Sequence, residues 1–150
     1  MDNNATTRVY EEVLEAMLPY FKEKYFNPSS MYSVAGGVHK EMEKAREQVA
    51  DFLGCEKVEV CFVSCGSEGD NMAIRGTIEA YPTKNHIITT KVEHPAVIET
   101  CKSLERLGYR ITLLDVDNDG NINLEELKKS VNENTAIVSI MYANNETGVI

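Results

Sequence analysis

The chain has 150 residues, of which 24 are Asp or Glu and 15 are Lys or Arg, so its formal net charge is −9. This length suffices for one ordinary domain with a hydrophobic core, and the acidic balance argues against a general binder of nucleic acid or of anionic membranes. No segment reads as a membrane span and the N-terminus lacks a basic-then-apolar leader, so we expect a cytoplasmic protein with no membrane association.

Two helices are predicted in the first third of the chain. Apolar residues recur every four positions over residues 8–24, with Thr7 as N-cap and a kink at Pro19. Residues 27–30 and Gly36-Gly37 predict a loop. A second amphipathic pattern predicts a helix over residues 38–52 that stops at Gly54. Residues 1–54 are therefore expected to form an N-terminal helical segment.

From residue 55 onward, predicted strands and helices alternate. Pro95 at a first helical position and Asn123 with Glu126 as a capping box are typical helix starts. Strand-helix alternation predicts the α/β class, with a mostly parallel sheet and flanking helices over residues 55–150. The expected strands are 58–63, 86–90, 109–114 and 136–141, and the expected helices are 67–80, 95–107 and 124–131.

The segment Ser64–Asn71 is small and polar, and it joins the first predicted strand to a helix. Backbone N–H groups at such a helix start form an anion site, and phosphate is the usual anion, although an ordinary tight turn would also explain the sequence. Further polar clusters, Glu93-His94 and 144–146, follow two other strands. Ligands bind beyond the carboxyl ends of parallel strands, so the three clusters are expected to converge on one pocket.

The residues of these clusters suit a phosphorylated aromatic cofactor. The Gly66 backbone and Ser67 can hold a phosphate. His94 can act as a base, as a metal ligand, as a stacking ring or simply as a helix cap. Asn145 can donate to a ring oxygen or serve as a turn residue. A P-loop nucleotide site is disfavoured, because no G-x-x-x-x-G-K-[ST] pattern occurs.

Five motifs in order resemble the cysteine desulfurases of the NifS/IscS type, in the class V aminotransferase group: 2–7, 27–30, 64–71, 93–97 and 138–148. The resemblance implies part of the large domain of a fold-type I transferase that uses pyridoxal 5′-phosphate. It also implies that Gly66 and Ser67 hold the cofactor phosphate, that His94 stacks on the pyridine ring and handles protons in catalysis, and that Asn145 bonds the phenolic oxygen. Family members usually have Ala-Thr in place of Gly66-Ser67, and Ser instead of Gly69.

The same resemblance implies an activity and partners. Such enzymes convert L-cysteine to L-alanine and pass the sulfur, held as an enzyme persulfide, to an acceptor protein for iron–sulfur cluster or thio-cofactor synthesis, and they act as homodimers. Their Schiff-base Lys and sulfur-accepting Cys correspond to positions beyond Ile150, so the 150-residue chain alone is expected to be inactive. A selenocysteine lyase or another class V lyase is the alternative.

We expect no metal site, and two features of the sequence bear on this expectation. Cys55, Cys61, Cys65 and Cys101 are not spaced like metal ligands, and only Cys65, at a helix N-terminus, is expected to have a lowered thiol pKa. Residues 115–126 match the EF-hand loop pattern, which would define a calcium-binding module. A strand rather than a helix is expected before this loop, so a strand-to-helix turn is favoured.

Overall fold

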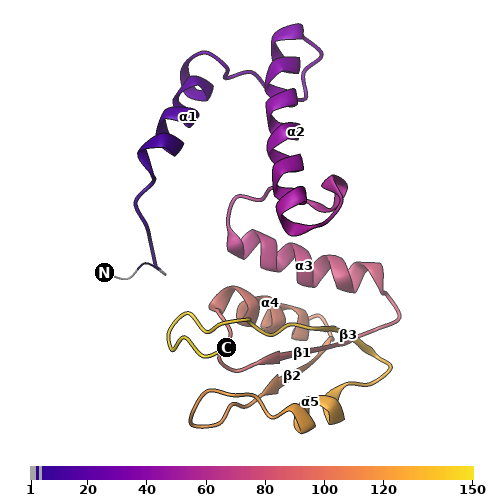
Figure 1. The fold of residues 1–150 in the computed structure, drawn as a ribbon. Coiled ribbons are helices and arrows are strands. Elements are labelled where there is room, and N and C mark those ends of the chain that lie inside the picture. Colours follow the sequence, from indigo (N-terminus) through magenta and orange to yellow (C-terminus); the bar gives the residue numbers. More distant parts are fainter. Residues whose placement is uncertain (1–2, 4) are drawn as a thin grey trace. The chain divides into compact units, whose positions relative to one another are not determined.

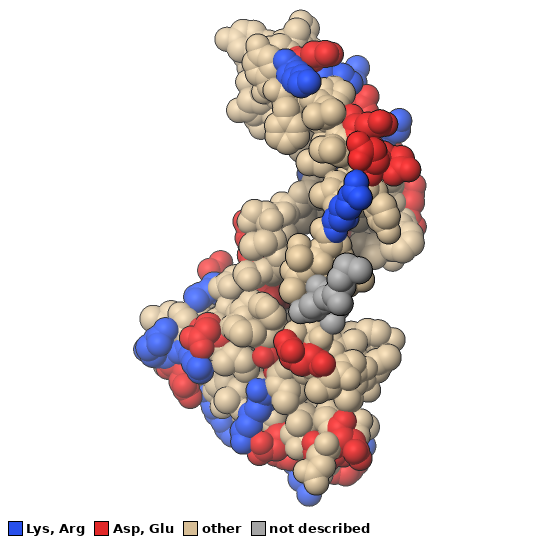
Figure 2. Space-filling view, turned by 90° about the vertical axis from the view of Figure 1, so that its left-hand side faces the viewer, with Lys and Arg blue, Asp and Glu red and all other residues tan. Residues whose placement is uncertain are grey.

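The computed structural model describes residues 3 and 5–150, which form two compact units, residues 1–62 and 63–150. Of the N-terminal motif 2–7, Asp2 and Asn4 lie outside the described residues. Figure 1 shows the elements in chain order. None of the helices in the described part of the chain combines the length and the apolar character that crossing a bilayer requires. On the face drawn in Figure 2, acidic and basic side chains are interspersed.

The first unit contains two helices, α1 (Glu11–Lys22) and α2 (Ser33–Leu53). Helix α1 begins three residues later than expected, after Tyr10 and not after a Thr7 cap, and it continues through Pro19. Helix α2 begins five residues earlier than expected and takes in Gly36 and Gly37. Burial explains this extension, because Ala35 in its first turn is 1% exposed. The predicted stop is confirmed, since Gly54 has a φ of 69°.

The predicted strand 58–63 is wrong. A 3-10 turn, η1 (Lys57–Glu59), stands there instead, closed by a reciprocal capping box between Glu56 and Glu59. Val58 is 86% exposed, and Arg46 donates a hydrogen bond to the Val60 carbonyl oxygen. A strand needs a partner backbone, and among the described residues this segment pairs with none. Apolar, β-branched composition alone therefore gave the wrong element.

The second unit is a three-stranded parallel sheet with helices on its faces. Its strands are β1 (His86–Thr90), β2 (Arg110–Leu114) and β3 (Thr135–Val138), in the order β2-β1-β3. Its helices are α3 (Gly66–Ala80), α4 (Pro95–Glu105) and α5 (Leu124–Ser130). The α/β class, the parallel sheet and the six elements from residue 66 onward are confirmed, with shifts of a few residues at their ends.

Helices α3 and α4 cover one face of the sheet, and α5 lies on its other side (Figure 1). The core between α3, α4 and the sheet is an apolar cluster that includes Ile87, a fully buried residue of β1. Its other buried members are Ile74, Ile78, Val97, Cys101 and Leu104. This packing fixes the direction of the strands, and all three strands end toward the loops that carry the predicted site.

A buried polar network closes the opposite end of the sheet around His86, which is 1% exposed. The side-chain amide of Asn132 donates to Nδ1 of His86 at 3.1 Å, so the proton of the neutral ring lies on Nε2, 2.8 Å from the Thr112 hydroxyl. The Thr135 hydroxyl lies 2.9 Å from Nδ1. Burial lowers the pKa of His86, and the neighbouring Arg110 lowers it further.

This network predicts a pH dependence of stability. Because the folded-state pKa of His86 lies below its unfolded value of about 6.5, the unfolded chain binds the extra proton first. The stability that neutral His86 contributes is complete above pH ~6.5 and is lost as the pH falls below it. Urea unfolding of the purified protein between pH 5 and 8 measures this loss. His86→Gln is expected to flatten the profile, whereas the exposed-site control His39→Gln keeps it; equal slopes would contradict the assignment.

Candidate functional site

The predicted anion site lies at the start of α3. The N-cap of α3 is Cys65, whose side chain makes no capping hydrogen bond. The first backbone hydrogen bond of the helix runs from the Gly69 N–H to the Cys65 carbonyl oxygen. The N–H groups of Gly66, Ser67 and Glu68 therefore have no carbonyl partner within the helix. An added Cβ at Gly66 would meet no atom within 4 Å, so the approach to this backbone is open.

Two pKa shifts show that the start of α3 stabilises negative charge. The Glu68 N–H and the Ser64 hydroxyl lower the pKa of the Cys65 thiol, as predicted from its position. The Glu68 carboxylate accepts from the Ser64 N–H at 2.5 Å and from the Ser64 hydroxyl at 2.7 Å, which lowers the pKa of Glu68. The Glu68 carboxylate thus turns back toward the preceding loop, while the Glu68 and Ser67 N–H groups act on the Cys65 sulfur.

His94 is the N-cap of α4, directly beyond the end of β1. Its Nδ1 accepts the Ala96 N–H at 3.1 Å, so its neutral ring carries a proton on Nε2. Pro95 follows at the first helical position, which fixes the chain direction at this point. The ring is exposed, so capping occupies one nitrogen and leaves the ring face and Nε2 free to act on a ligand.

Asn145 lies in the loop that follows β3. The preceding Asn144 shapes this loop, because its Oδ1 accepts the N–H groups of Glu146 and Thr147, each at 2.9 Å. The exposed side-chain amide of Asn145 donates to Glu146 Oε1 at 2.9 Å. Asn145 thus projects from a loop with fixed backbone geometry.

The structure brings the three loops to one end of the sheet. In Figure 1, the start of α3, the end of β1 and the C-terminal loop lie on the same side. Glu93 joins two of them, because its Oε1 accepts the Met141 N–H at 2.5 Å. The Asp70 carboxylate of α3 is near enough to raise the pKa of Glu93. The structure contains no direct hydrogen bond among Gly66, Ser67, His94 and Asn145, all of which it describes. They lie at the same edge of the sheet (Figure 1).

Glu93 and Asn144 were not predicted as functional residues. Each is the neighbour of a predicted residue, in the polar clusters 93–94 and 144–146. Their partners lie about fifty residues away in the chain, and no local pattern identifies such a pair. The one available signal was that a carboxylate and an amide follow two strands that were expected to end at the same edge.

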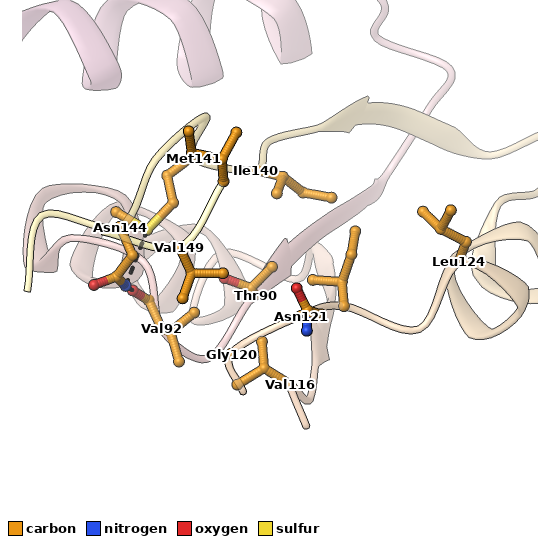
Figure 3. A pocket seen from close by; sticks show the side chains of 12 residues that line it. Thr90, Val92, Val116, Gly120, Asn121, Leu124, Ile140, Met141, Asn144 and Val149 are labelled. Atoms are coloured by element: carbon orange, nitrogen blue, oxygen red, sulfur yellow. Dashed lines mark hydrogen bonds between the residues drawn. The ribbon is translucent and has the colours of Figure 1, made fainter. Parts of the chain in front are cut away.

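A cavity of about 380 Å³ lies beside these loops (Figure 3), between the end of β1 and the loops after β2 and β3. Its lining is mostly apolar and includes Val92, Val116, Met141 and Val149, with Asn144 at one side. None of Gly66, Ser67, His94 and Asn145 lines it. The predicted phosphate site is therefore separate from this cavity, which is not the shared pocket expected for the three clusters.

The EF-hand-like loop 115–126 has its own internal partners. Strand β2 leads into it, as expected, and Asp115 pairs with Lys91 Nζ at 2.6 Å. The Asp117 carboxylate accepts the N–H groups of Asn121 and Asp119, each at 2.9 Å, and these bonds lower its pKa. Asn123 caps α5 by accepting the N–H groups of Glu125 and Glu126. Within the described part of the chain, no three His, Cys, Asp or Glu side chains are arranged to hold a metal ion.

Residues 1–150 match the aminotransferase class-V family, and the chain belongs to this family. Within that group it is similar to cysteine desulfurases. It is 55% identical over 150 residues to the cysteine desulfurase of Trichormus azollae, of which it covers 38%.

Two solved structures agree with this. A NifS-like protein superimposes with a TM-score of 0.92 at 46% identity, over 97% of this chain and 40% of that one. SspA in complex with cysteine superimposes with a TM-score of 0.90 at 34% identity, over 97% of this chain and 42% of that one. The chain thus spans about two fifths of the length of the relatives it matches.

Proposed function

We propose that residues 1–150 form the phosphate-binding part of a cysteine desulfurase, which binds pyridoxal 5′-phosphate and removes the sulfur of L-cysteine to leave L-alanine. Residues 55–150 are then the first part of its large domain, and residues 1–54 precede it as a helical segment. The observation that carries the proposal is the meeting of three polar loops at one edge of the sheet (Figure 1), two of which are joined by the Glu93–Met141 hydrogen bond. The similarity to cysteine desulfurases supports the choice of substrate.

The donor set at the start of α3 fits the cofactor phosphate. Three backbone N–H groups without carbonyl partners in the helix, the Ser67 hydroxyl and the positive end of a fifteen-residue helix all favour a phosphate dianion. The lowered pKa of Cys65 supports this, since the same N–H groups already stabilise negative charge there. The serine at position 67 keeps the hydroxyl of the usual threonine.

The remaining residues would orient the cofactor ring. His94 stacks on the ring and exchanges protons only through Nε2, because Nδ1 is held by the Ala96 N–H. Asn145 donates its amide to the phenolic oxygen. The bound cofactor supplies an electron sink for the substrate. These residues bind and orient it, and His94 is the group of this chain that moves a proton.

The partners follow from the same assignment. We infer a cytoplasmic homodimer with L-cysteine as substrate and a sulfur-acceptor protein as partner. The similarity to SspA in complex with cysteine supports the substrate. We assign the Schiff-base lysine and the sulfur-accepting cysteine to the part of the relatives' length that residues 1–150 do not span.

The direct test uses the purified protein with pyridoxal 5′-phosphate. We expect a visible absorption band of bound cofactor, and release of alanine from L-cysteine only by a protein that also contains the Schiff-base lysine and the sulfur-accepting cysteine. Residues 1–150 alone are expected to release none. L-Selenocysteine is the comparison substrate, and a preference for it would transfer the assignment to a selenocysteine lyase. Absence of cofactor binding would reject the proposal altogether.

Substitution of His94 separates its two roles. His94→Phe keeps a flat ring, so its cofactor dissociation constant is expected to stay within about threefold of wild type while alanine release falls. His94→Ala is expected to weaken binding about tenfold, because it removes the stacking surface. Both lose the cap of α4, at about 1 kcal/mol of unfolding free energy. Fluorescence titration and urea unfolding measure these effects, with His39→Ala as control; cofactor binding by His94→Ala at wild-type strength would exclude stacking.

A further inference from the structure

Glu93 is a half-buried carboxylate between three segments of the second unit. Its Oε1 accepts the Met141 N–H at 2.5 Å, across 48 residues of sequence. Burial raises the pKa of Glu93, the Met141 N–H opposes this, and the negative charge of Asp70 adds to it. Burying a carboxylate near a second one costs free energy. The hydrogen bond to the loop after β3 is the favourable interaction that offsets this cost.

Asn144 makes a second connection between the same two loops. Its Nδ2 donates to the Val92 carbonyl oxygen at 3.1 Å, across 52 residues, while its Oδ1 holds the turn that contains Asn145. Figure 3 shows Asn144 beside Val92 and Met141. The two connections thus join Val92 and Glu93, the two residues before His94, to Met141 and Asn144, which lie four residues and one residue before Asn145.

We propose that Glu93 and Asn144 are positioning residues, whose two hydrogen bonds hold His94 and Asn145 in fixed relation so that the ring and the amide can act on one ligand. Neither residue touches the cofactor in this proposal. A binding constellation must be held within about 0.5 Å, and supporting hydrogen bonds provide that precision. The inference rests on the proposed function, because it assigns a purpose to the spacing between His94 and Asn145.

The chain offers variants that remove single bonds. Asn144→Asp keeps the oxygen that holds the turn at Glu146 and Thr147, and loses the amide donor to the Val92 carbonyl oxygen and to Met141 Sδ. Glu93→Ala removes the acceptor of the Met141 N–H, whereas Glu93→Gln keeps an oxygen at that position. Exposed Asn118→Asp and Glu133→Ala make the same chemical changes elsewhere in the second unit and serve as matched controls.

Two measurements on the purified protein test the proposal. Hydrogen–deuterium exchange without cofactor tests whether the hydrogen bonds of Glu93 and Asn144 hold the loop after β3. Asn144→Asp and Glu93→Ala are expected to speed exchange over residues 139–147, while the buried turns of α4 keep the wild-type rate. Titration with pyridoxal 5′-phosphate tests whether these hydrogen bonds support cofactor binding. Both variants are expected to raise the cofactor dissociation constant about tenfold, as loss of one hydrogen bond implies. Glu93→Gln is expected to stay within about threefold in titration.

The outcomes separate this inference from the proposed function. If the wild-type protein binds no pyridoxal 5′-phosphate, the proposed function fails, and the exchange data still decide whether Glu93 and Asn144 hold the loop after β3. If His94→Ala weakens binding but Asn144→Asp and Glu93→Ala do not, the function stands and the positioning role is wrong. Faster exchange in α4 as well would make Glu93 a residue of general stability and would also overturn the positioning role.

Discussion

Replacing Ser67 with Asp is expected to weaken pyridoxal 5′-phosphate binding about a hundredfold without destabilising the fold. The new carboxylate would lie in the first turn of α3, where the helix dipole favours negative charge by about 0.5 kcal/mol. The same charge repels a phosphate dianion placed on the same N–H groups. Binding and stability should therefore change in opposite directions, which general damage to the protein cannot produce. Fluorescence titration and thermal unfolding measure the two quantities.

Ser67→Thr is the matched control, because it keeps the hydroxyl and introduces the residue that is usual in the family. It is expected to bind the cofactor as tightly as the wild type. Cofactor binding by Ser67→Asp at wild-type strength would place the phosphate elsewhere and remove the anion site from α3.

Replacing Ile87 with Ala is expected to lower the free energy of unfolding by about 3 kcal/mol. Ile87 of β1 is fully buried and packs among side chains from α3 and α4, so its truncation leaves a cavity that the helices cannot fill. Urea unfolding of the purified protein at constant pH measures the loss. Val138→Ala, on the 40% exposed side chain at the end of β3, is expected to cost about 1 kcal/mol or less.

Equal losses for the two variants would show that β1 is not the centre of the core. They would also weaken the account of the site, because the core fixes the direction of the strands that carry His94 and Asn145.

Local signals in the sequence predicted much of the second unit. Strand 86–90 was expected with the bounds that the structure shows, and Pro95 with His94 marked the start of α4 correctly. Asn123 was identified as the cap of α5 for the same reason. These signals work because a cap or a proline at the first helical position acts within a few residues of itself.

Long-range partners account for what could not be predicted. Segment 58–63 has the composition of a strand, but a strand exists only where another backbone pairs with it, and Arg46 takes the Val60 carbonyl instead. The early start of α2 depends on the burial of Ala35. The strand-end rule led us to expect three clusters around one pocket. The three loops share an edge although the strand expected before Ser64 is wrong, and the Glu93–Met141 bond that joins two of them was not predicted. The roles of Gly66, Ser67, His94 and Asn145 toward a cofactor stay predictions.

The pairing of β3 with β1 contains a register shift, which limits where insertions and deletions are tolerated in related sequences. Thr135 pairs with His86, but Ile137 pairs with Ile87, so Ala136 is an extra residue at this point. The shift lets Thr135 reach the His86 network on one face while Ile137 packs against the apolar core on the other. Deleting or adding one residue within 135–137 would force one of these contacts onto the wrong face. Related sequences should therefore align across this stretch without gaps, while the exposed turn at residues 117–121 can vary in length.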